Sequence, residues 1–175
     1  MSGIFGLYHL DGRPASRSQL QEMMQSLAHR GPDGQNAWSE GAVGLGHQML
    51  RTTPESLLEN LPLANSTNEI VITADARLDN RDELIELLGF GAEPREQISD
   101  SQLILAAYEA WDERCLERIL GDFAFAIWDG KKQRLFCARD RFGVKPFYYY
   151  SSAGLFAFAS EIKALLSLQE IPRRL

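Results

Sequence analysis

The heptapeptide FAFAIWD, residues 123–129, is the stretch that decides the fold. In an extended strand successive side chains point to opposite faces of the sheet. One face of this stretch carries Phe123, Phe125 and Ile127, and the other carries Ala124, Ala126 and Trp128. Because both faces are apolar, we expect the strand to be buried on both sides. A sheet hidden on both sides needs a second layer, which two stacked sheets with helices outside would supply.

The segments on either side of this strand alternate between helical and extended patterns. Strands are expected at residues 4–10, 42–50, 70–74, 134–140, 147–151 and 155–160, with hairpin turns at Asp129-Gly130 and Ala153-Gly154. Helices are expected after Ser16 or Ser18, from Asp79 or Asn80 to Leu88, after the capping box at Ser99, and over 161–168. Strands separated by helices and then by hairpins predict an α+β fold with antiparallel sheets.

Composition places the chain among ordinary globular domains. Its 175 residues suit one domain, and the 45% apolar and 24% charged content is typical of that class. The net charge of −6 argues against a nucleic-acid partner, which needs a basic face. No apolar run approaches the ~18 residues that span a membrane, and no secretion signal is recognisable. The sequence therefore predicts a cytoplasmic domain with neither a membrane nor a nucleic-acid partner.

Cysteines and histidines show no metal-ligand spacing, so no metal site is predicted. Cys115, on an expected helix, and Cys137, on an expected strand, are interpreted as two buried thiols. We expect His29 and His47 to be hydrogen-bonded structural residues. The charged run Arg139 to Lys145 is interpreted as a network that holds the loop between two strands, with docking of a partner as the alternative.

Several longer motifs occur along the whole chain in one order. They are MSGIFG at 1–6, HRGPD at 29–33, Gly46-His47, Ser99-Asp100, GDFAFA at 121–126, ARDRFGVKPFYY at 138–149 and ASEIKAL at 159–165. Together they resemble the N-terminal class II glutamine amidotransferase domain of the asparagine synthetase family. The resemblance covers residues 1–175 as a single type-2 domain. It implies an αββα four-layer sandwich of the N-terminal-nucleophile hydrolase type, with two antiparallel sheets and helices on both outer faces, in agreement with the argument from residues 123–129.

Ser2 occupies the position of the family's nucleophile. In that family a terminal cysteine, freed when methionine is removed, attacks glutamine, and its own α-amine is the base. An α-amine suits this role because its pKa, about 7.7–8.0, lies near working pH. Serine does this work in related hydrolases, but its hydroxyl ionises less easily than a thiol. If Met1 is retained, the amine belongs to Met1 instead. The alternative is that Ser2 is a small residue that begins a strand.

The family's glutamine-binding arginine aligns with Met49, which cannot bind a carboxylate. Arg51 lies two residues further on. On a continuing strand it would point to the same face, about 7 Å along the chain. A bulge could bring Arg51 back to the required place, so it stays a candidate for this role.

The family's Asn-Gly-Glu run aligns with Asp75, Ala76 and Arg77. Ala76 keeps the backbone N–H of the oxyanion site, but Asp75 replaces a donor with an acceptor. Losing one such donor costs about 2.7–4 kcal/mol. A carboxylate ~4 Å from the developing charge adds a repulsion of about 4 kcal/mol at an effective dielectric constant near 20. Arg77 would repel the ammonium group of glutamine, whereas Asp100 still suits it.

Each of these residues also has a structural interpretation. Asp75 and Arg77 could form an exposed ion pair on one strand face. Asp100 could be a favourable charge at a helix N-terminus. If the interpretation from the family holds instead, the pocket carries the wrong charges for glutamine. The sequence then predicts a glutaminase-like domain that keeps the fold and does not hydrolyse glutamine.

The synthetase domain that follows in this family binds ATP through a Ser-Gly-Gly-x-Asp-Ser loop, which does not occur in these 175 residues. ATP and magnesium are therefore expected only for that missing domain, and no cofactor for this chain. The synthetase domain, in cis or in trans, is the expected partner.

The run DARLDNRDEL, residues 75–84, resembles the asparagine-synthetase-like cyclases of lasso peptide biosynthesis. Those enzymes join a peptide's own amine to an acidic side chain, so they need no ammonia from glutamine. The resemblance implies a scaffold or docking half for a macrolactam cyclase, with a precursor peptide as a further partner. The alternative is an active class II amidotransferase or amidohydrolase that uses Ser2 and feeds ammonia to asparagine synthesis.

Overall fold

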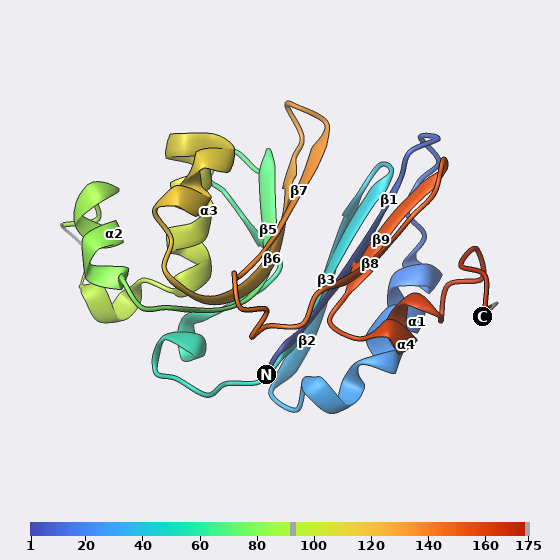
Figure 1. Cartoon of the computed structure of the whole chain (residues 1–175), viewed down its shortest axis with the longest axis horizontal. Helices are drawn as coiled ribbons and strands as arrows, with labels where there is room; N and C mark the ends of the chain where they lie inside the picture. The colour runs from blue at the N-terminus through green and yellow to red at the C-terminus, as the bar shows by residue number, and fades with distance from the viewer. Residues whose placement is uncertain (92–93, 174–175) are drawn as a thin grey trace. The chain divides into compact units, whose positions relative to one another are not determined.

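Two antiparallel sheets, each with its own helices, make up the computed structural model of the chain (Figure 1), which describes residues 1–91 and 94–173. The chain divides into two compact units, one of residues 1–50 with the segment from Pro146 onward, and one of Arg51–Lys145. None of the described helices is long and apolar enough to cross a membrane.

The first unit is built on a five-stranded sheet. Its strands lie in the order β2 (Gly34–Glu40), β3 (Val43–Met49), β1 (Gly3–His9), β9 (Leu155–Ala159) and β8 (Tyr148–Ser151). The helices are α1 (Arg17–Ser26), α4 (Ile162–Leu165) and a 3-10 helix at Ala28–Arg30. Ser16 begins α1 with a full capping box, since its hydroxyl accepts from Gln19 N and the Gln19 side chain accepts from Ser16 N. Apolar side chains of the helices and of β1 and β9 form the core of this unit.

The second unit is built on a four-stranded sheet. Its strands lie in the order β4 (Leu63–Ala64), β5 (Ile70–Leu78), β6 (Gly121–Asp129) and β7 (Arg134–Arg139). The helices are α2 (Arg81–Leu87) and α3 (Asp100–Trp111), with 3-10 helices at Glu55–Leu58, Arg95–Gln97 and Asp112–Glu117. Ser99 begins α3 with the expected capping box. Leu84, Leu103, Ile104 and Tyr108 from the helices pack with Phe125 of β6 in the core.

The central strand β6 is buried on both faces, as the sequence predicts. Phe123, Phe125 and Ile127 belong to the core that β5 and β6 share with α2 and α3. Ala124, Ala126 and Trp128 are at most 5% exposed. Both cysteines are free thiols, and burial raises the pKa of Cys115 to about 11 and that of Cys137 to about 12.

Three strand predictions need correction. The two-residue strand β4 was not expected, and it pairs with β5. β2 was not expected, because its residues 34–40 alternate only weakly and are mostly exposed. β5 was expected to end at residue 74 but continues to Leu78, which pairs with Gly121 of β6. Cross-strand pairing therefore carries the polar residues Asp75 and Arg77 into the strand, despite their low intrinsic preference for it.

Candidate functional site

Ser2 lies just before β1 with its side chain tied to the backbone of Leu50. The Ser2 Oγ accepts a hydrogen bond from Leu50 N at 3.0 Å and donates one to Leu50 O at 3.3 Å. The residue is 7% exposed. A nucleophilic hydroxyl must give its proton to a base, whereas this proton points to a carbonyl oxygen. The Ser2 hydroxyl is therefore used in backbone hydrogen bonds just before β1, and its role as nucleophile stays a prediction.

A basic cluster around Glu161 supports the backbone of Ser2. Arg30 Nη1 donates to Ser2 O at 3.4 Å, and Arg30 Nε also bonds to Glu161. His29 Nε2 lies 2.8 Å and Lys163 Nζ 3.1 Å from the same carboxylate. Partial burial opposes ionisation of Glu161, but these three partners outweigh it and lower its pKa to about 2. The prediction of a hydrogen-bonded structural role is confirmed for His29.

His47 is buried on β3, where burial lowers its pKa to about 3. Its ring is therefore neutral at physiological pH. This agrees with the structural interpretation and leaves no cationic imidazole on β3.

Met49 and Arg51 do not share a strand. β3 ends at Met49, which is 7% exposed, and Arg51 lies beyond the strand with an exposed side chain. The premise that Arg51 continues the same strand face is therefore wrong. Met49 has no group that could bind a carboxylate.

Asp75 forms a buried ion pair that the sequence did not reveal. Its Oδ1 accepts from Lys145 Nζ at 2.9 Å, and the two side chains are only 8% and 13% exposed. The interpretation of Asp75 and Arg77 as an exposed ion pair is wrong, because Asp75 is buried and bonds to Lys145 while Arg77 is exposed. Among the described residues the Asp75 Oδ2 has no hydrogen-bond partner.

The Asp75–Lys145 pair changes the electrostatic argument. Lys145 neutralises most of the field of Asp75, so the repulsion of an anionic intermediate is smaller than for an isolated carboxylate. Asp75 still presents an acceptor where the sequence comparison predicts a donor. Ala76, predicted for the oxyanion site, lies opposite Phe123 on β6, and Arg77, predicted for the glutamine site, lies opposite Asp122.

Lys145 lies in the loop that follows β7, and the side chains of Arg139 and Asp140 hydrogen-bond to the backbone of this loop. Asp140 Oδ1 accepts from Phe142 N at 3.1 Å and Val144 N at 2.9 Å, and its Oδ2 accepts from Lys145 N at 3.0 Å. Arg139 donates to the carbonyl oxygens of Lys145 and Gly143 at 2.6 and 2.5 Å. The predicted loop-holding network is confirmed for Arg139, Asp140 and Lys145. Lys145 was the residue that could have revealed the pair, because a lysine is rarely buried unless an acidic side chain pairs with it.

Asp100 begins α3 and is already paired with a cation. It forms an ion pair with Arg81, and its Oδ2 accepts from Leu78 N at 3.2 Å. Burial raises the pKa of Asp100 above its usual range, although Arg81 and the Leu78 N–H act in the opposite direction. An α-ammonium group would have to displace Arg81 to reach this carboxylate. Arg81 lies in the first turn of α2, where the helix dipole favours an acidic residue. An arginine at this unfavourable position could have indicated, from the sequence, that it pairs with a specific acid.

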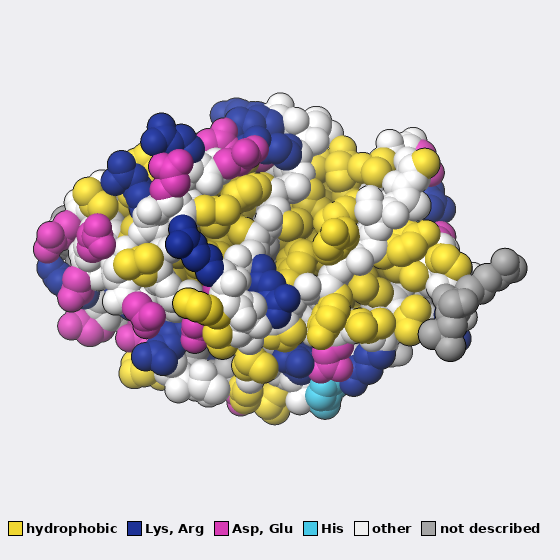
Figure 2. Space-filling model, in the orientation of Figure 1, with side chains coloured by type: hydrophobic (Ala, Val, Ile, Leu, Met, Phe, Trp, Pro, Cys, Tyr) yellow, Lys and Arg dark blue, Asp and Glu magenta, His cyan; other side chains and the backbone are white. Residues whose placement is uncertain are grey.

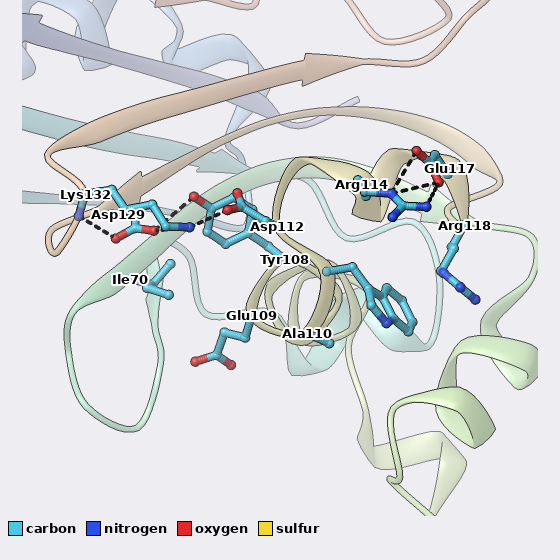
Figure 3. Close-up of a pocket in the computed structure, with 11 residues that line it drawn as sticks. Ile70, Tyr108, Glu109, Ala110, Asp112, Arg114, Glu117, Arg118, Asp129 and Lys132 are labelled. Carbon is cyan, nitrogen blue, oxygen red and sulfur yellow. Dashed lines mark hydrogen bonds and ion pairs between the residues drawn. The ribbon is translucent and has the colours of Figure 1, made fainter.

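Another group of charges lines a pocket of about 480 Å³ at the C-terminal end of α3 (Figure 3). Lys132 Nζ lies 2.5 Å from Asp112 and 3.3 Å from Asp129, and Tyr108 donates to Asp129 at 3.1 Å. Arg114 pairs with Glu117 across one helical turn. These charges satisfy one another, and none of the residues predicted for the active site lines this pocket.

Comparison with known proteins identifies the family to which this chain belongs. The glutamine amidotransferase domain family matches residues 1–175. The chain belongs to this family. More specifically, it is an N-terminal class II glutamine amidotransferase domain of the asparagine synthetase family.

Two curated relatives illustrate the range of enzymes that contain a similar domain. Asparagine synthetase [glutamine-hydrolyzing] 3 of Bacillus subtilis is 35% identical over 176 residues, with 99% of this chain and 29% of the relative covered. Amidase chyE of Penicillium rubens is 31% identical over 153 residues, with 85% of this chain and 22% of the relative covered. The amidotransferase domain thus spans less than a third of either relative.

The solved structure of glutamine phosphoribosylpyrophosphate amidotransferase from B. subtilis superposes with a TM-score of 0.75 at 18% identity, over 94% of this chain and 43% of the other. This likeness concerns the fold alone. It confirms the predicted α+β class of the N-terminal-nucleophile hydrolase type, with two antiparallel sheets and helices.

Proposed function

We propose that this amidotransferase domain no longer hydrolyses glutamine and serves as the docking half of an ATP-dependent, amide-forming enzyme. The observation that carries the proposal is internal pairing of the carboxylates at a predicted oxyanion position and at a predicted substrate position. Asp75 is paired with Lys145, and Asp100 is paired with Arg81. The ammonium group of a free amino acid must displace Arg81 to reach Asp100, and Asp75 offers an oxyanion no donor.

Chemistry at Ser2 supports the same proposal. The hydroxyl is held by both backbone groups of Leu50, and Met49 replaces the arginine that would bind the carboxylate of glutamine. Without that arginine the carboxylate of glutamine has no partner, and without the amide donor at Asp75 only the Ala76 N–H remains for the oxyanion. The loss of one oxyanion donor alone costs about 2.7–4 kcal/mol of transition-state stabilisation.

The partner in this proposal is a synthetase domain in cis or in trans, which would use ATP and magnesium while this domain binds neither. This chain covers only 29% of asparagine synthetase 3 of Bacillus subtilis, so most of that relative lies outside the amidotransferase domain. A docking surface is available on the loop that follows β7, where Phe142 is 92% and Val144 48% exposed. A rigid loop with an exposed aromatic side chain is typical of an interface anchor.

Macrolactam formation is the form of amide synthesis that we favour for the parent enzyme. The peptide substrate of such a cyclase would supply its own amine, so a glutaminase site could be lost without loss of the reaction. The run at residues 75–84, which contains both Asp75 and Arg81, supports this assignment through its resemblance to lasso peptide cyclases.

The competing function is a working glutamine amidotransferase or amidohydrolase with Ser2 as its nucleophile. Two observations favour it: the curated relative is named as glutamine-hydrolysing, and Lys145 reduces the unfavourable field of Asp75. It requires complete removal of Met1 and acylation of Ser2.

An ammonia-release assay with glutamine separates the two functions, after intact mass has established whether Met1 is present. We expect no turnover from the natural sequence, and none from Ser2→Cys, because Met49, Asp75 and Arg77 remain. Turnover that disappears in Ser2→Ala would establish the competing function. Robust hydrolysis by Ser2→Cys would show that the other positions do not block the site. For the docking role, Phe142→Ser should weaken binding to a separately produced synthetase domain at least tenfold. The control is Leu57→Ser, which removes another exposed apolar side chain, on the 3-10 helix Glu55–Leu58.

A further inference from the structure

The edge strand β2 borders a groove that is separate from every residue of the candidate site. β2 is the first strand in the order of its sheet, and it pairs on one side with β3. Its residues Gln35 to Ser39 line a groove of about 560 Å³ together with residues of α1. Leu20, Met24, Ala37 and Trp38 supply apolar surface, and Arg17 is the charged residue among those that line the groove.

The backbone of β2 presents unused pairing groups to this groove. Glu40 pairs with Val43 across the two-residue turn Gly41-Ala42, so alternate residues of β2 bond to β3. The N–H and C=O groups of Gln35, Ala37 and Ser39 then point away from β3. The bond from Ala37 N to the side-chain Oδ1 of Asn36, at 2.9 Å, is consistent with this direction.

Asn36 acts as a local substitute for a neighbouring strand. Its side chain accepts from the one outward N–H in the middle of β2, which protects an otherwise open edge. A side-chain acceptor on an exposed residue can be displaced by a peptide carbonyl. The edge is therefore available to a ligand that offers a full strand of donors and acceptors.

We propose that β2 and α1 form a docking groove for an extended peptide segment, which adds to the sheet as a further strand. Main-chain hydrogen bonds to Gln35, Ala37 and Ser39 give the affinity. Apolar side chains at every second position of the peptide enter the groove against Leu20, Met24 and Ala37. A carboxylate on the peptide pairs with Arg17. The partner is thus an extended, alternately apolar segment of polypeptide with an acidic residue near one end, and this role does not depend on the proposed function.

The probe is a capped peptide of alternating valine and threonine with one terminal glutamate, labelled for fluorescence anisotropy. Ala37→Pro removes the central outward N–H without touching the bonds between β2 and β3, and an edge strand tolerates proline at such a position. We expect this variant to bind the probe at least tenfold more weakly. Asn36→Ala removes the internal competitor for the same N–H, and should bind the probe several-fold more tightly.

Charge reversal tests the groove independently of the proline variant. Arg17→Glu should weaken the glutamate probe several-fold and strengthen a probe that carries lysine in its place. Circular dichroism establishes that each variant is folded. Equal affinity of the natural sequence, Ala37→Pro and Arg17→Glu for the probe would overturn the proposal, as would the absence of binding at millimolar peptide. Self-association in light scattering that Ala37→Pro abolishes would assign the edge to a second copy and also overturn it.

Discussion

The two units of the domain hold the residues that the sequence predicts for the active site in different ways. In the first unit the Ser2 hydroxyl is held by neutral backbone groups of Leu50. In the second unit Asp75 and Asp100 are held by Lys145 and Arg81. A neutral hydrogen bond contributes about 0.5–1.5 kcal/mol, whereas removal of one partner of a buried ion pair costs about 3–5 kcal/mol. We therefore expect the ion pairs of the second unit to be more firmly held than the Ser2 hydroxyl.

The largest effect is expected for Lys145→Met. This change leaves Asp75 with only 8% of its side chain exposed and without its cation. We expect the free energy of unfolding to fall by about 3–5 kcal/mol, measured by urea denaturation at pH 7.

The matched control is Lys131→Met, which removes a pair with Glu69 whose lysine is 68% exposed. Exposed pairs contribute about 0–1 kcal/mol, so this control should change little. The double variant Asp75→Asn with Lys145→Met should recover most of the loss, because no buried charge remains. A single-variant loss no greater than that of the control would mean that Asp75 is not buried as a charge.

Arg81→Met should have the next largest effect, about 2–4 kcal/mol at pH 7, because Asp100 loses its guanidinium partner. The raised pKa of Asp100 gives the sign of the pH dependence. The folded state holds this proton more tightly than the unfolded state, so stability falls as pH rises through the raised pKa. The loss should therefore be smaller at pH 4 than at pH 7, because a raised pKa favours protonation of the carboxyl as the pH falls. A loss that is the same at pH 7 and pH 4 would point to packing of the arginine side chain instead.

Strong local patterns explain why most elements could be predicted. The alternation in residues 123–129 and the capping boxes at Ser16 and Ser99 are complete within a few residues, so their structures follow from sequence. β2 could not be predicted, because its pairing with β3 comes from chain reversal at Gly41 and not from its own apolar pattern. The same holds for the end of β5, which depends on the partner strand β6.

At the candidate site, the sequence could identify the unusual residues but not what satisfies them. Asp75 was recognisable as an acid in the place of an amide, yet its partner Lys145 lies 70 residues away in sequence. Arg81 and Asp100 are similarly separated by 19 positions and meet only because α2 and the start of α3 belong to one unit. Ion pairs between distant segments follow from topology, which composition and spacing do not encode.

Glu161→Gln probes the cluster beside Ser2 and should have a smaller effect. Its pKa of about 2 lies below the ordinary value of 4.5. A depressed acid contributes stability that is present above about pH 4.5 and lost as pH falls towards 2. Because its side chain is 24% exposed, solvent screening reduces the contribution to about 1–2 kcal/mol. Urea denaturation from pH 7 to pH 2 should show the two proteins converging at the acid end, and a constant difference would exclude an electrostatic origin.

Ser2→Ala should have the smallest effect on stability, and it tests the first unit as Lys145→Met tests the second. It removes one acceptor and one donor to the backbone of Leu50, which is only partly buried, so water can replace part of what is lost. We expect a loss of about 1 kcal/mol at pH 7, measured by urea denaturation with Ser39→Ala on the exposed strand β2 as the control. If Ser2→Ala lowered the free energy of unfolding more than Lys145→Met does, the Ser2 hydroxyl would be held more firmly than the Asp75 pair. The hydroxyl would then be a principal structural tie, which is incompatible with release of its proton during each turnover of a nucleophile.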